Sequence, residues 1–249
     1  MSYQLIGNNI IKLNTITSTN NYAAKLVSQT KIPFGTVIMA DFQSKGKGQR
    51  DSSWISQKSQ NLLLSFIVDS SFLHSKSIFY LSKITALVIR EFIYEILQTD
   101  TLIKWPNDIL VGNKKIAGIL IENQWKNNYI SSSIVGMGIN VNQIIFPDKI
   151  NAISLKEISG KNYDLRLLLD LLNDIYNRWI TFLKKQKMKL IDDEYHQNLL
   201  NFNKWAIYST KESQFKAKLK EVNQLGLLIL KLENGKEKSY NLKEIIQVI

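Results

Sequence analysis

A loop at residues 43–54 combines residue types that could bind an anionic ligand. Within it, the glycines Gly46 and Gly48 lie among basic residues and precede an aromatic ring. The other loop residues that could contact a ligand are Gln43, Lys45, Lys47, Gln49, Arg50 and Trp54. Glycine lets the backbone approach a ligand closely, and lysine and arginine bind phosphate or carboxylate groups. The loop therefore predicts a site for an anionic molecule that contains a ring, with a solvated basic turn as the alternative.

This loop follows neither of two common phosphate-binding patterns. The P-loop spacing, Gly-x4-Gly-Lys-Ser/Thr, is absent from it. A dinucleotide-binding loop has a third glycine and leads directly into a helix, and neither feature follows Gly48. The loop is therefore assigned to neither class.

Three consecutive polar residues, Ser18, Thr19 and Asn20, stand where a helix is expected to begin. Capping of a helix N-terminus explains one such side chain well. The others could bind a small neutral polar head group, next to the free amides of the first helical turn. Capping alone remains the alternative.

A second polar cluster, Lys-Trp-Pro-Asn-Asp, occupies a corner between two expected strands and begins at Lys104. Its proline favours an extended conformation for Trp105. Asn107 and Asp108 then lie at the corner itself. An ordinary Asx turn would explain these two residues without any ligand.

The strands that follow carry a lysine and alternating glycines. Lys115 precedes a strand whose later residues are apolar, so its side chain can point into a site instead of into water. In the next strand, Gly136 and Gly138 predict the close approach of another group to the backbone. Asn140 and Asn142 are expected to share one face of that strand.

A framework of strands and two long helices must position these clusters. Apolar residues at helical spacing predict helices at 78–97 and 165–183, and the apolar stripe of the second helix is assigned to the core. Shorter helices are expected at 22–27 and 189–199. The expected strands of this part are 9–15, 36–42, 61–68, 101–104, 109–111, 115–122 and 129–141.

The pattern changes near residue 201, where short strands separated by turns begin. These strands are expected at 205–208, 214–222, 226–232 and 237–242. They predict a small β-barrel domain at 201–249 behind a larger domain at 1–200.

Composition narrows the possible chemistry. The chain has 249 residues and no cysteine, which excludes disulfides, thiolate metal sites and cysteine nucleophiles and fits a reducing cytoplasm. Only two histidines, His74 and His196, occur, which argues against a multi-histidine metal site. The net charge of +11 favours an acidic partner, a nucleotide or a nucleic acid, or a lysine-rich surface. No segment has the pattern of a secretory signal or of a membrane span, so a cytoplasmic protein without a membrane partner is expected.

Taken together and in order, these clusters resemble the motifs of the biotin protein ligase family. Ser18-Thr19-Asn20 is similar to its STN segment, and residues 46–54 are similar to its GRGRxxRxW signature. Residues 104–108 match its KWPND motif, residues 115–120 its KxxGIL motif and residues 138–140 its GIN motif. More loosely, residues 241–245 resemble the closing segment of the family.

The resemblance implies an α+β fold with two parts. The first is a mixed-sheet catalytic domain like that of class II aminoacyl-tRNA synthetases, which binds biotin and ATP, and the second is a small SH3-like β-barrel. It also implies a two-step reaction. Biotin and ATP first form biotinyl-5′-AMP and pyrophosphate, and a lysine of a biotin carboxyl carrier protein then attacks that mixed anhydride to give an amide. Mg²⁺ would accompany ATP, held mainly by phosphate and water.

The resemblance also implies roles for residues on the biotin side of the site. Ser18, Thr19 and Asn20 would contact the ureido head of biotin, with Gln43 beside it. Further residues would line the valeryl arm and the junction of carboxylate and phosphate; these are Lys47, Gly48 and Gln49. Gly46 and Arg50 belong to the same binding loop.

On the nucleotide side, the resemblance implies that Trp54 covers the adenine and that Asn140 hydrogen-bonds the nucleotide. Lys115 would bridge the biotin carboxylate and the α-phosphate as the main catalytic residue, with Lys47 at the reacting junction. Asp108 would orient the acceptor lysine or the metal ion. The binding set is completed by Lys104, Asn107, Gly118 and Gly138.

The chain departs from the family pattern inside the loop. Gln49 replaces an arginine, Asp51 replaces a usual glycine, and Ser52 replaces a frequent arginine. These changes predict a loop that closes less tightly or depends more on its ligand. About 17 residues precede Ser18, too few for a DNA-binding domain, so a ligase without repressor function and without DNA as a partner is expected.

Two other functions remain open. A lipoate or octanoate protein ligase would share the fold and the adenylate chemistry, although the KWPND, GIN and STN segments favour biotin. A basic nucleic-acid-binding module would use the terminal β-domain as its reader. The sequence leaves the oligomeric state open, including a homodimer.

Overall fold

The structure is a computed structural model that describes residues 5–49, 52–127 and 129–248. Its large sheet has seven strands in the order β1-β2-β3-β7-β6-β5-β4. The bounds of these strands are β1 Asn9–Ile16, β2 Thr36–Gln43, β3 Asn61–Asp69, β4 Leu102–Lys104, β5 Asp108–Val111, β6 Lys114–Lys126 and β7 Tyr129–Asn140. β1 and β2 pair in parallel, whereas the other neighbours pair antiparallel.

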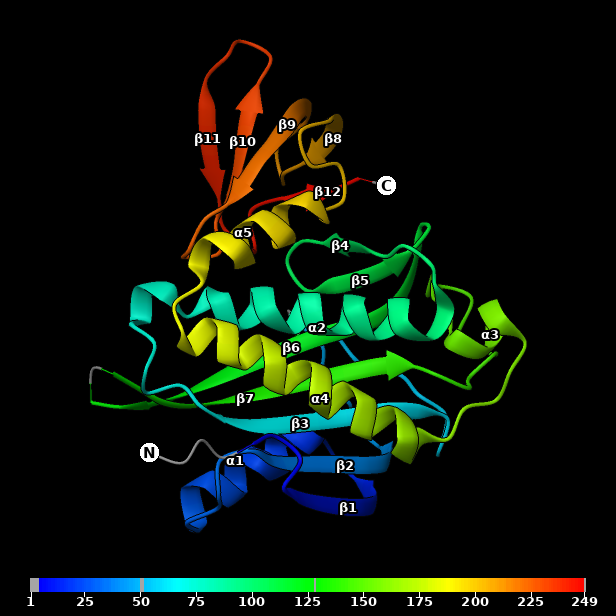
Figure 1. Ribbon diagram of the computed structural model, residues 1–249. Coiled ribbons are helices and arrows are strands. Elements are labelled where there is room, and N and C mark those ends of the chain that lie inside the picture. The colour runs from blue at the N-terminus through cyan, green and yellow to red at the C-terminus, as the bar shows by residue number, and fades with distance from the viewer. Residues whose placement is uncertain (1–4, 50–51, 128, 249) are drawn as a thin grey trace.

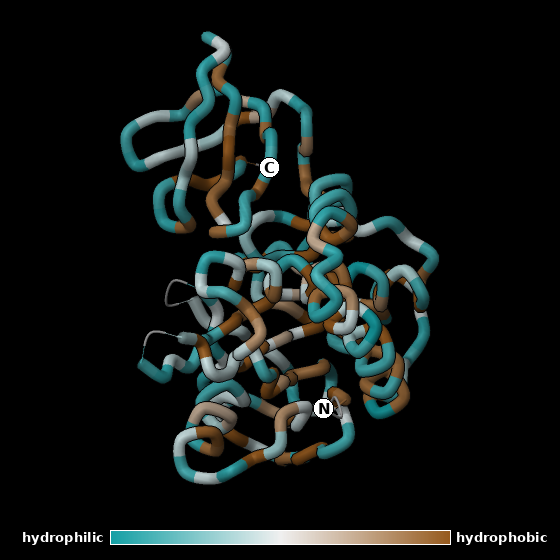
Figure 2. Tube along the Cα trace, turned by 60° about the vertical axis from the view of Figure 1, so that its left-hand side comes forward, coloured by the Kyte–Doolittle hydropathy of each residue, from teal (hydrophilic) through white to brown (hydrophobic). Residues whose placement is uncertain are grey.

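Helices cover both faces of the large sheet. The long helices α2 and α4 lie across one face (Figure 1), and α1 packs on the opposite face against Ile38, Ile67 and Ile134. The helix bounds are α1 Thr19–Gln29, α2 Phe79–Leu97, α3 Leu155–Ser159, α4 Leu165–Lys184 and α5 Met188–Gln197, with a 3₁₀ turn at Ser75–Ser77. Buried apolar residues of α2 and α4 pack with those of β3, β6 and β7 in one core, and Figure 2 shows hydrophobic stretches in the middle of the molecule. None of the helices in the described part of the chain is long and apolar enough to cross a bilayer.

The apolar stripe of α4 is confirmed as core. Leu169, Leu172, Tyr176, Trp179 and Leu183 are all buried, and they follow the helical spacing that places side chains on one face. The helix begins where the carboxylate of Asp164 accepts hydrogen bonds from two backbone N–H groups, as an N-cap residue does.

A second, antiparallel sheet occupies the end of the chain, in the order β11-β10-β9-β8-β12. Its strands are β8 Trp205–Ser209, β9 Gln214–Val222, β10 Leu228–Leu232, β11 Glu237–Tyr240 and β12 Ile246–Gln247. It stands beyond one end of the large sheet, close to α5, β4 and β5 (Figure 1). The expected α+β class, with a mixed sheet followed by a small β unit, is confirmed.

Buried polar contacts connect the second sheet to the rest of the molecule. The Lys83 ammonium, on α2, lies 2.6 Å from the Asp192 carboxylate and donates to the Val222 carbonyl at 2.7 Å. The indole N–H of Trp105 donates to the carbonyl of Gly226 at 3.1 Å. Since buried polar groups require partners, these contacts fix the sheet at a defined place.

Three short elements were not expected from the sequence: the 3₁₀ turn, α3 and β12. They contain too few residues for a period to be detected. The expectation that Asn140 and Asn142 share a strand face was wrong. β7 ends at Asn140, and Asn142 instead exchanges hydrogen bonds with the backbone of Tyr163.

Candidate active site

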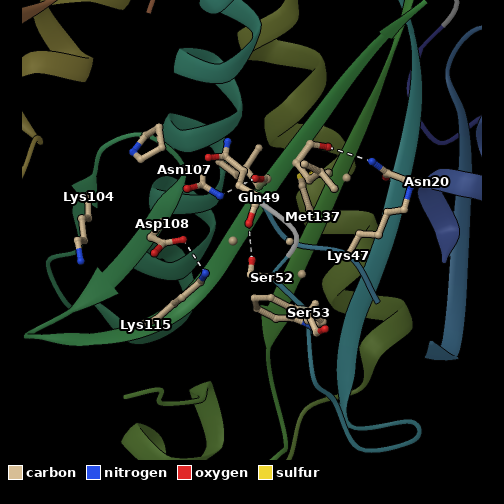
Figure 3. A pocket seen from close by; sticks show the side chains of 18 of the residues that line it. Asn20, Lys47, Gln49, Ser52, Ser53, Lys104, Asn107, Asp108, Lys115 and Met137 are labelled. Carbon is tan, nitrogen blue, oxygen red and sulfur yellow. Dashed lines mark hydrogen bonds and ion pairs between the residues drawn. The ribbon is translucent and has the colours of Figure 1, made fainter. Parts of the chain in front are cut away.

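A cavity of about 280 Å³ brings together the polar clusters that the sequence singled out. It lies over β6 and β7, beneath the loop that follows β2 (Figure 3). Lys104, Asn107, Asp108 and Lys115 come from one side, and Asn20 and Lys47 from the other. Most of the predicted site residues line it, namely Ser18, Thr19, Asn20, Gln43, Lys47, Gly48, Gln49, Trp54, Lys104, Asn107, Asp108, Lys115, Gly118 and Gly138.

The polar cluster at the start of α1 faces this cavity. Ser18 occupies the N-cap position, but its side chain accepts no hydrogen bond from the helix, so capping does not explain its hydroxyl. Thr19 donates from both its backbone N–H and its hydroxyl to Oε1 of Gln43, at 2.7 and 3.0 Å. The predicted association of Gln43 with this cluster is therefore present as a direct contact.

Asn20 is held in one orientation by three partners. Its amide group donates to the Leu120 carbonyl at 3.2 Å and to Oε2 of Glu122 at 2.7 Å. Its carbonyl oxygen accepts from the Ser65 hydroxyl at 2.6 Å. The other carboxylate oxygen of Glu122 lies 3.8 Å from the ammonium of Lys47, so one carboxylate contacts both the helix-start cluster and the loop.

The loop folds back on itself as a narrow hairpin. The Gly48 N–H donates to the Ser52 carbonyl at 2.7 Å, and the Trp54 N–H donates to the Gly46 carbonyl at 2.9 Å. A Cβ on Gly48 would lie 2.3 Å from the Ser52 hydroxyl oxygen, so a larger residue there would displace the Ser52 side chain. Arg50 and Asp51 lie outside the described residues, so the role of Arg50 and the effect of Asp51 remain predictions.

Trp54 lies flat against two glycines of the sheet. A Cβ on Gly138 would come within 2.4 Å of the Trp54 ring, and one on Gly118 within 3.1 Å. The close approach predicted at Gly138 is therefore made by this indole. Its N–H is buried and has no hydrogen-bond partner among the described residues. An unpaired buried donor in a cavity wall is a group that a ligand can satisfy.

Lys115 and Asp108 form an ion pair in the cavity wall. The Lys115 ammonium lies 2.6 Å from the Asp108 carboxylate and 5.5 Å from the centre of the Trp54 ring. Both side chains remain partly exposed, at 30% and 25%. The ammonium can therefore reach an anion in the cavity while the Lys115 backbone is held by strand pairing.

Asn140 lies behind Lys115 and does not line the cavity. It is buried, and its amide donates to the carbonyls of Lys115 and Ile153 at 3.3 and 3.0 Å. It thus supports the backbone of Lys115, and its contact with a nucleotide remains a prediction. Gly46 contacts an open groove on the other side of the loop.

The sequence missed several lining residues. Ile245, Ile246 and Gln247 reach the cavity from the end of the second sheet. Trp105 and Pro106 reach it from residues 104–108, which we call the corner motif. Glu122 and Ser65 were also missed as partners of Asn20. A serine inside the apolar run 61–68 was a visible signal for the latter, whereas the link between Asn20 and Glu122 spans 102 residues.

The donor set of the cavity does not form a protein metal cage. No group of three metal-binding side chains occurs in the part of the chain that the structure describes. Asp108 is the one carboxylate among the described lining residues. One carboxylate beside an amide side chain, that of Asn107, suits Mg²⁺ that keeps phosphate and water ligands.

Comparison with known proteins places the motifs in a family. The model of the Biotin/lipoate A/B protein ligase family matches residues 13–140. The "Bifunctional ligase/repressor BirA" of Bacillus spizizenii is 30% identical over 246 residues, which cover 96% of this chain and 74% of that protein. The "Biotin--[acetyl-CoA-carboxylase] ligase" of Paracoccus denitrificans is 26% identical over 140 residues, covering 54% of this chain and 58% of that protein.

The fold agrees with solved structures of similar proteins. The biotin protein ligase of Aquifex aeolicus in complex with biotin and ATP superposes with a TM-score of 0.81 at 26% identity, covering 97% of this chain and 99% of that one. The similarity therefore extends over both sheets.

Proposed function

The chain belongs to the Biotin/lipoate A/B protein ligase family, and we infer that it is an ATP-dependent biotin protein ligase. One observation carries this conclusion. A single cavity gathers the STN cluster, the basic loop and the Lys115–Asp108 pair in a chain similar to ligases that bind biotin and ATP. The relatives named above for their substrate are biotin ligases, which favours biotin over lipoate or octanoate.

We propose that the STN cluster and Gln43 bind the ureido head of biotin. The amide of Asn20 is already oriented by Ser65, Leu120 and Glu122, so little side-chain freedom is lost when the ligand binds. The hydroxyl of Ser18 is free of a capping role and faces the same cavity. Lys47, Gly48 and Gln49 then line the arm that leads to the carboxylate.

The proposed reacting centre is Lys115. Both steps build negative charge, first at phosphorus and then at the acyl oxygen, and a preorganised cation stabilises such charge. Lys115 is held by its backbone and by Asp108, so its ammonium is positioned before the substrates arrive. Lys47 adds a second cation on the loop, which reduces the repulsion between the two substrate anions.

The nucleotide is proposed to bind near Trp54, whose ring covers the adenine. A cavity of about 280 Å³ is close to the lower limit of about 300 Å³ for small-molecule sites. We propose that Trp54 and the loop move outward to admit both substrates. This supports the expected ligand-dependent loop. Equal hydrogen exchange at residues 44–54 with and without biotin and ATP would refute it.

Mg²⁺ is proposed to enter with ATP. Asp108 and Asn107 would hold it, and the ion would supply neutralisation of phosphate charge. The acceptor is proposed to be the lysine of a biotin carboxyl carrier protein, since one relative is named for the acetyl-CoA carboxylase that it modifies. We retain the division into domains at 1–200 and 201–249 and a cytoplasmic location as proposals; the lack of cysteine supports the latter.

A homodimer is a further proposal. Beyond Gly118, the outer edge of β6 has no strand partner among the described residues. An open strand edge can pair with the same edge of a second copy. Light scattering across a concentration series would measure the mass, and a constant monomer mass would refute this assembly.

The decisive experiment is biotin-dependent exchange of pyrophosphate into ATP. Wild-type protein should catalyse exchange, and Lys115→Ala should reduce it strongly while leaving the melting temperature nearly unchanged. Absence of exchange in the wild type would refute the function. Full exchange in the variant would place the catalytic role elsewhere. Titration with biotin and with lipoate, in separate experiments, tests the substrate.

A further inference from the structure

The outer face of the second sheet presents an exposed patch of apolar and basic residues. The register of β8 and β9 pairs Trp205 with Lys218 and Ile207 with Lys216, and β12 pairs Ile246 with Ser209. Since paired residues share a face and side chains alternate along each strand, all five side chains point the same way. We call Trp205, Ile207, Ile246, Lys216 and Lys218 the outer patch.

The apolar members of the outer patch are exposed. Trp205, Ile207 and Ile246 are 44%, 42% and 57% exposed, whereas Tyr208 and Gln247, which alternate with them, are buried. Exposed aromatic and branched residues that adjoin one another indicate an interaction surface. Trp205 is also the residue type most enriched among dominant contacts in protein interfaces.

The outer patch carries two ammonium groups, and Glu212, Glu233 and Glu244 line a hollow that Lys216 shares. The ammonium groups of Lys216 and Lys218 lie 5.9 and 5.8 Å from the centre of the Trp205 ring. Neither lysine takes part in an ion pair within the described residues. The paired rows of β8, β9 and β12 that form the patch contain no carboxylate. The patch therefore matches a partner with an apolar centre and acidic residues beside it.

The outer patch is continuous with the active-site cavity. Ile246 belongs to the patch and also lines the cavity. From this rim the patch follows β8 from Ser209 back to Trp205, which at roughly 3.3 Å per residue spans about 13 Å. A protein whose lysine enters the cavity must lie across its rim, because a lysine side chain has only a four-carbon stem.

We propose that the outer patch docks the acceptor protein in the second step of the reaction, with acidic residues of the acceptor facing Lys216 and Lys218. This proposal rests on the proposed ligase function. It gives the second sheet a role in transfer to the acceptor. Formation of the adenylate does not use Trp205, Ile207, Lys216 or Lys218, none of which lines the cavity.

The test separates the two steps in the full-length protein. Trp205→Ala and the double variant Lys216→Glu/Lys218→Glu are compared with Lys236→Glu, an exposed lysine in the turn between β10 and β11. The first readout is pyrophosphate exchange. The second is the rate of biotin transfer to the carrier domain of a bacterial acetyl-CoA carboxylase at increasing carrier concentration.

Both patch variants should retain wild-type exchange and should raise the KM for the carrier domain about tenfold or more, as expected for a central interface contact. Lys236→Glu should leave both readouts unchanged. Raising NaCl from about 50 to about 500 mM should raise the wild-type KM, and this dependence should weaken in the double variant, because screening acts on the lost charges.

Other results would overturn the proposal. If both patch variants exchange pyrophosphate normally and keep a carrier KM within twofold of the wild type, the acceptor does not dock on this patch. Lack of exchange in the wild type would instead refute the ligase function itself. Should the charge reversals lower the melting temperature, Lys216→Gln/Lys218→Gln and Ile207→Lys provide independent tests of the same face.

Discussion

Glu122 should set the affinity for biotin although it does not line the cavity. Its carboxylate accepts from the buried Asn20 amide at 2.7 Å and lies 3.8 Å from the Lys47 ammonium. Replacing it with alanine leaves one amide N–H of Asn20 without its partner. An unsatisfied buried donor costs about 1–3 kcal/mol. Because the Glu122 side chain is 38% exposed, water can replace the carboxylate in part, and the lower half of that range applies.

Without that acceptor the Asn20 amide can reorient in the free protein, and its orientation must be restored when biotin binds. A rise of about tenfold in the Kd for biotin, equivalent to about 1.4 kcal/mol, is therefore expected for Glu122→Ala. Glu122→Gln keeps an acceptor for Asn20 and loses only the ion pair with Lys47. Since partly exposed pairs contribute about 0–1 kcal/mol, its Kd should rise threefold or less. Isothermal titration with biotin measures both values.

The matched control is Glu157→Ala. Glu157 forms an ion pair with Lys114 at 3.4 Å and has a side chain exposed to 34%, but neither residue lines the cavity. This variant should bind biotin like the wild type. If Glu122→Ala binds biotin within twofold of the wild type, or if Glu122→Gln is weakened as strongly as Glu122→Ala, Glu122 does not orient Asn20 for the ligand.

Two further predictions concern the glycines of β7 and the link between the sheets. A methyl group on Gly136 would lie 2.4 Å from Oδ1 of Asn20, and one on Gly138 would lie 2.4 Å from the Trp54 ring. Gly136→Ala should therefore raise the Kd for biotin, whereas Gly138→Ala should mainly raise the KM for ATP; the reverse pattern would contradict the assigned subsites. Burial, and then the ammonium of Lys83, lower the pKa of His196 in the folded protein. The contribution of neutral His196 to stability is therefore complete above the pKa of about 6.5 in the unfolded chain. It is lost as the pH falls towards the lower pKa of the folded protein. Between about pH 7.5 and 5.5, the melting temperature of the wild type should fall further than that of His196→Gln, and equal falls would show that His196 does not titrate in the folded protein.

Long helices and strands could be predicted from the sequence because their apolar residues recur at a regular spacing over many residues. The two long helices span many turns. The buried face of α4 follows the helical spacing, whereas α2 is also buried outside it, at Lys83, Thr85 and Ile89. Short elements carry no such signal. α3 depends on caps at Ser154 and Gly160, and β12 exists because it pairs with β8, so its two residues form a strand only in the folded molecule.

Site residues could be predicted where they are consecutive in the sequence. They could not be predicted where the contact joins residues far apart in the sequence. The corner motif and the Ser18–Asn20 cluster are each a run of consecutive residues, and both line the cavity. Glu122 meets Asn20 only because β6 pairs with β7, against which α1 packs. The amide of Asn140 could not be assigned from strand period either, since its partners are carbonyls of other segments.

The corner motif contacts both the cavity and the second sheet. Lys104, Asn107 and Asp108 line the cavity, while the indole of Trp105, in the same stretch, donates to the Gly226 carbonyl in the turn between β9 and β10. Gly226 has a φ of +83°, and a Cβ there would lie 2.4 Å from the Phe79 ring, so only glycine lets this turn approach.

The same sheet returns to the cavity through Ile245, Ile246 and Gln247. One wall of the cavity therefore depends on where the second sheet docks, and that docking depends on the segment that positions Asp108 against Lys115. A change in the contact between Trp105 and Gly226 must alter both the wall and the ion pair, because a rigid, packed segment transmits a shift at one end to the other. Adenylate formation and acceptor docking are thus linked through five consecutive residues.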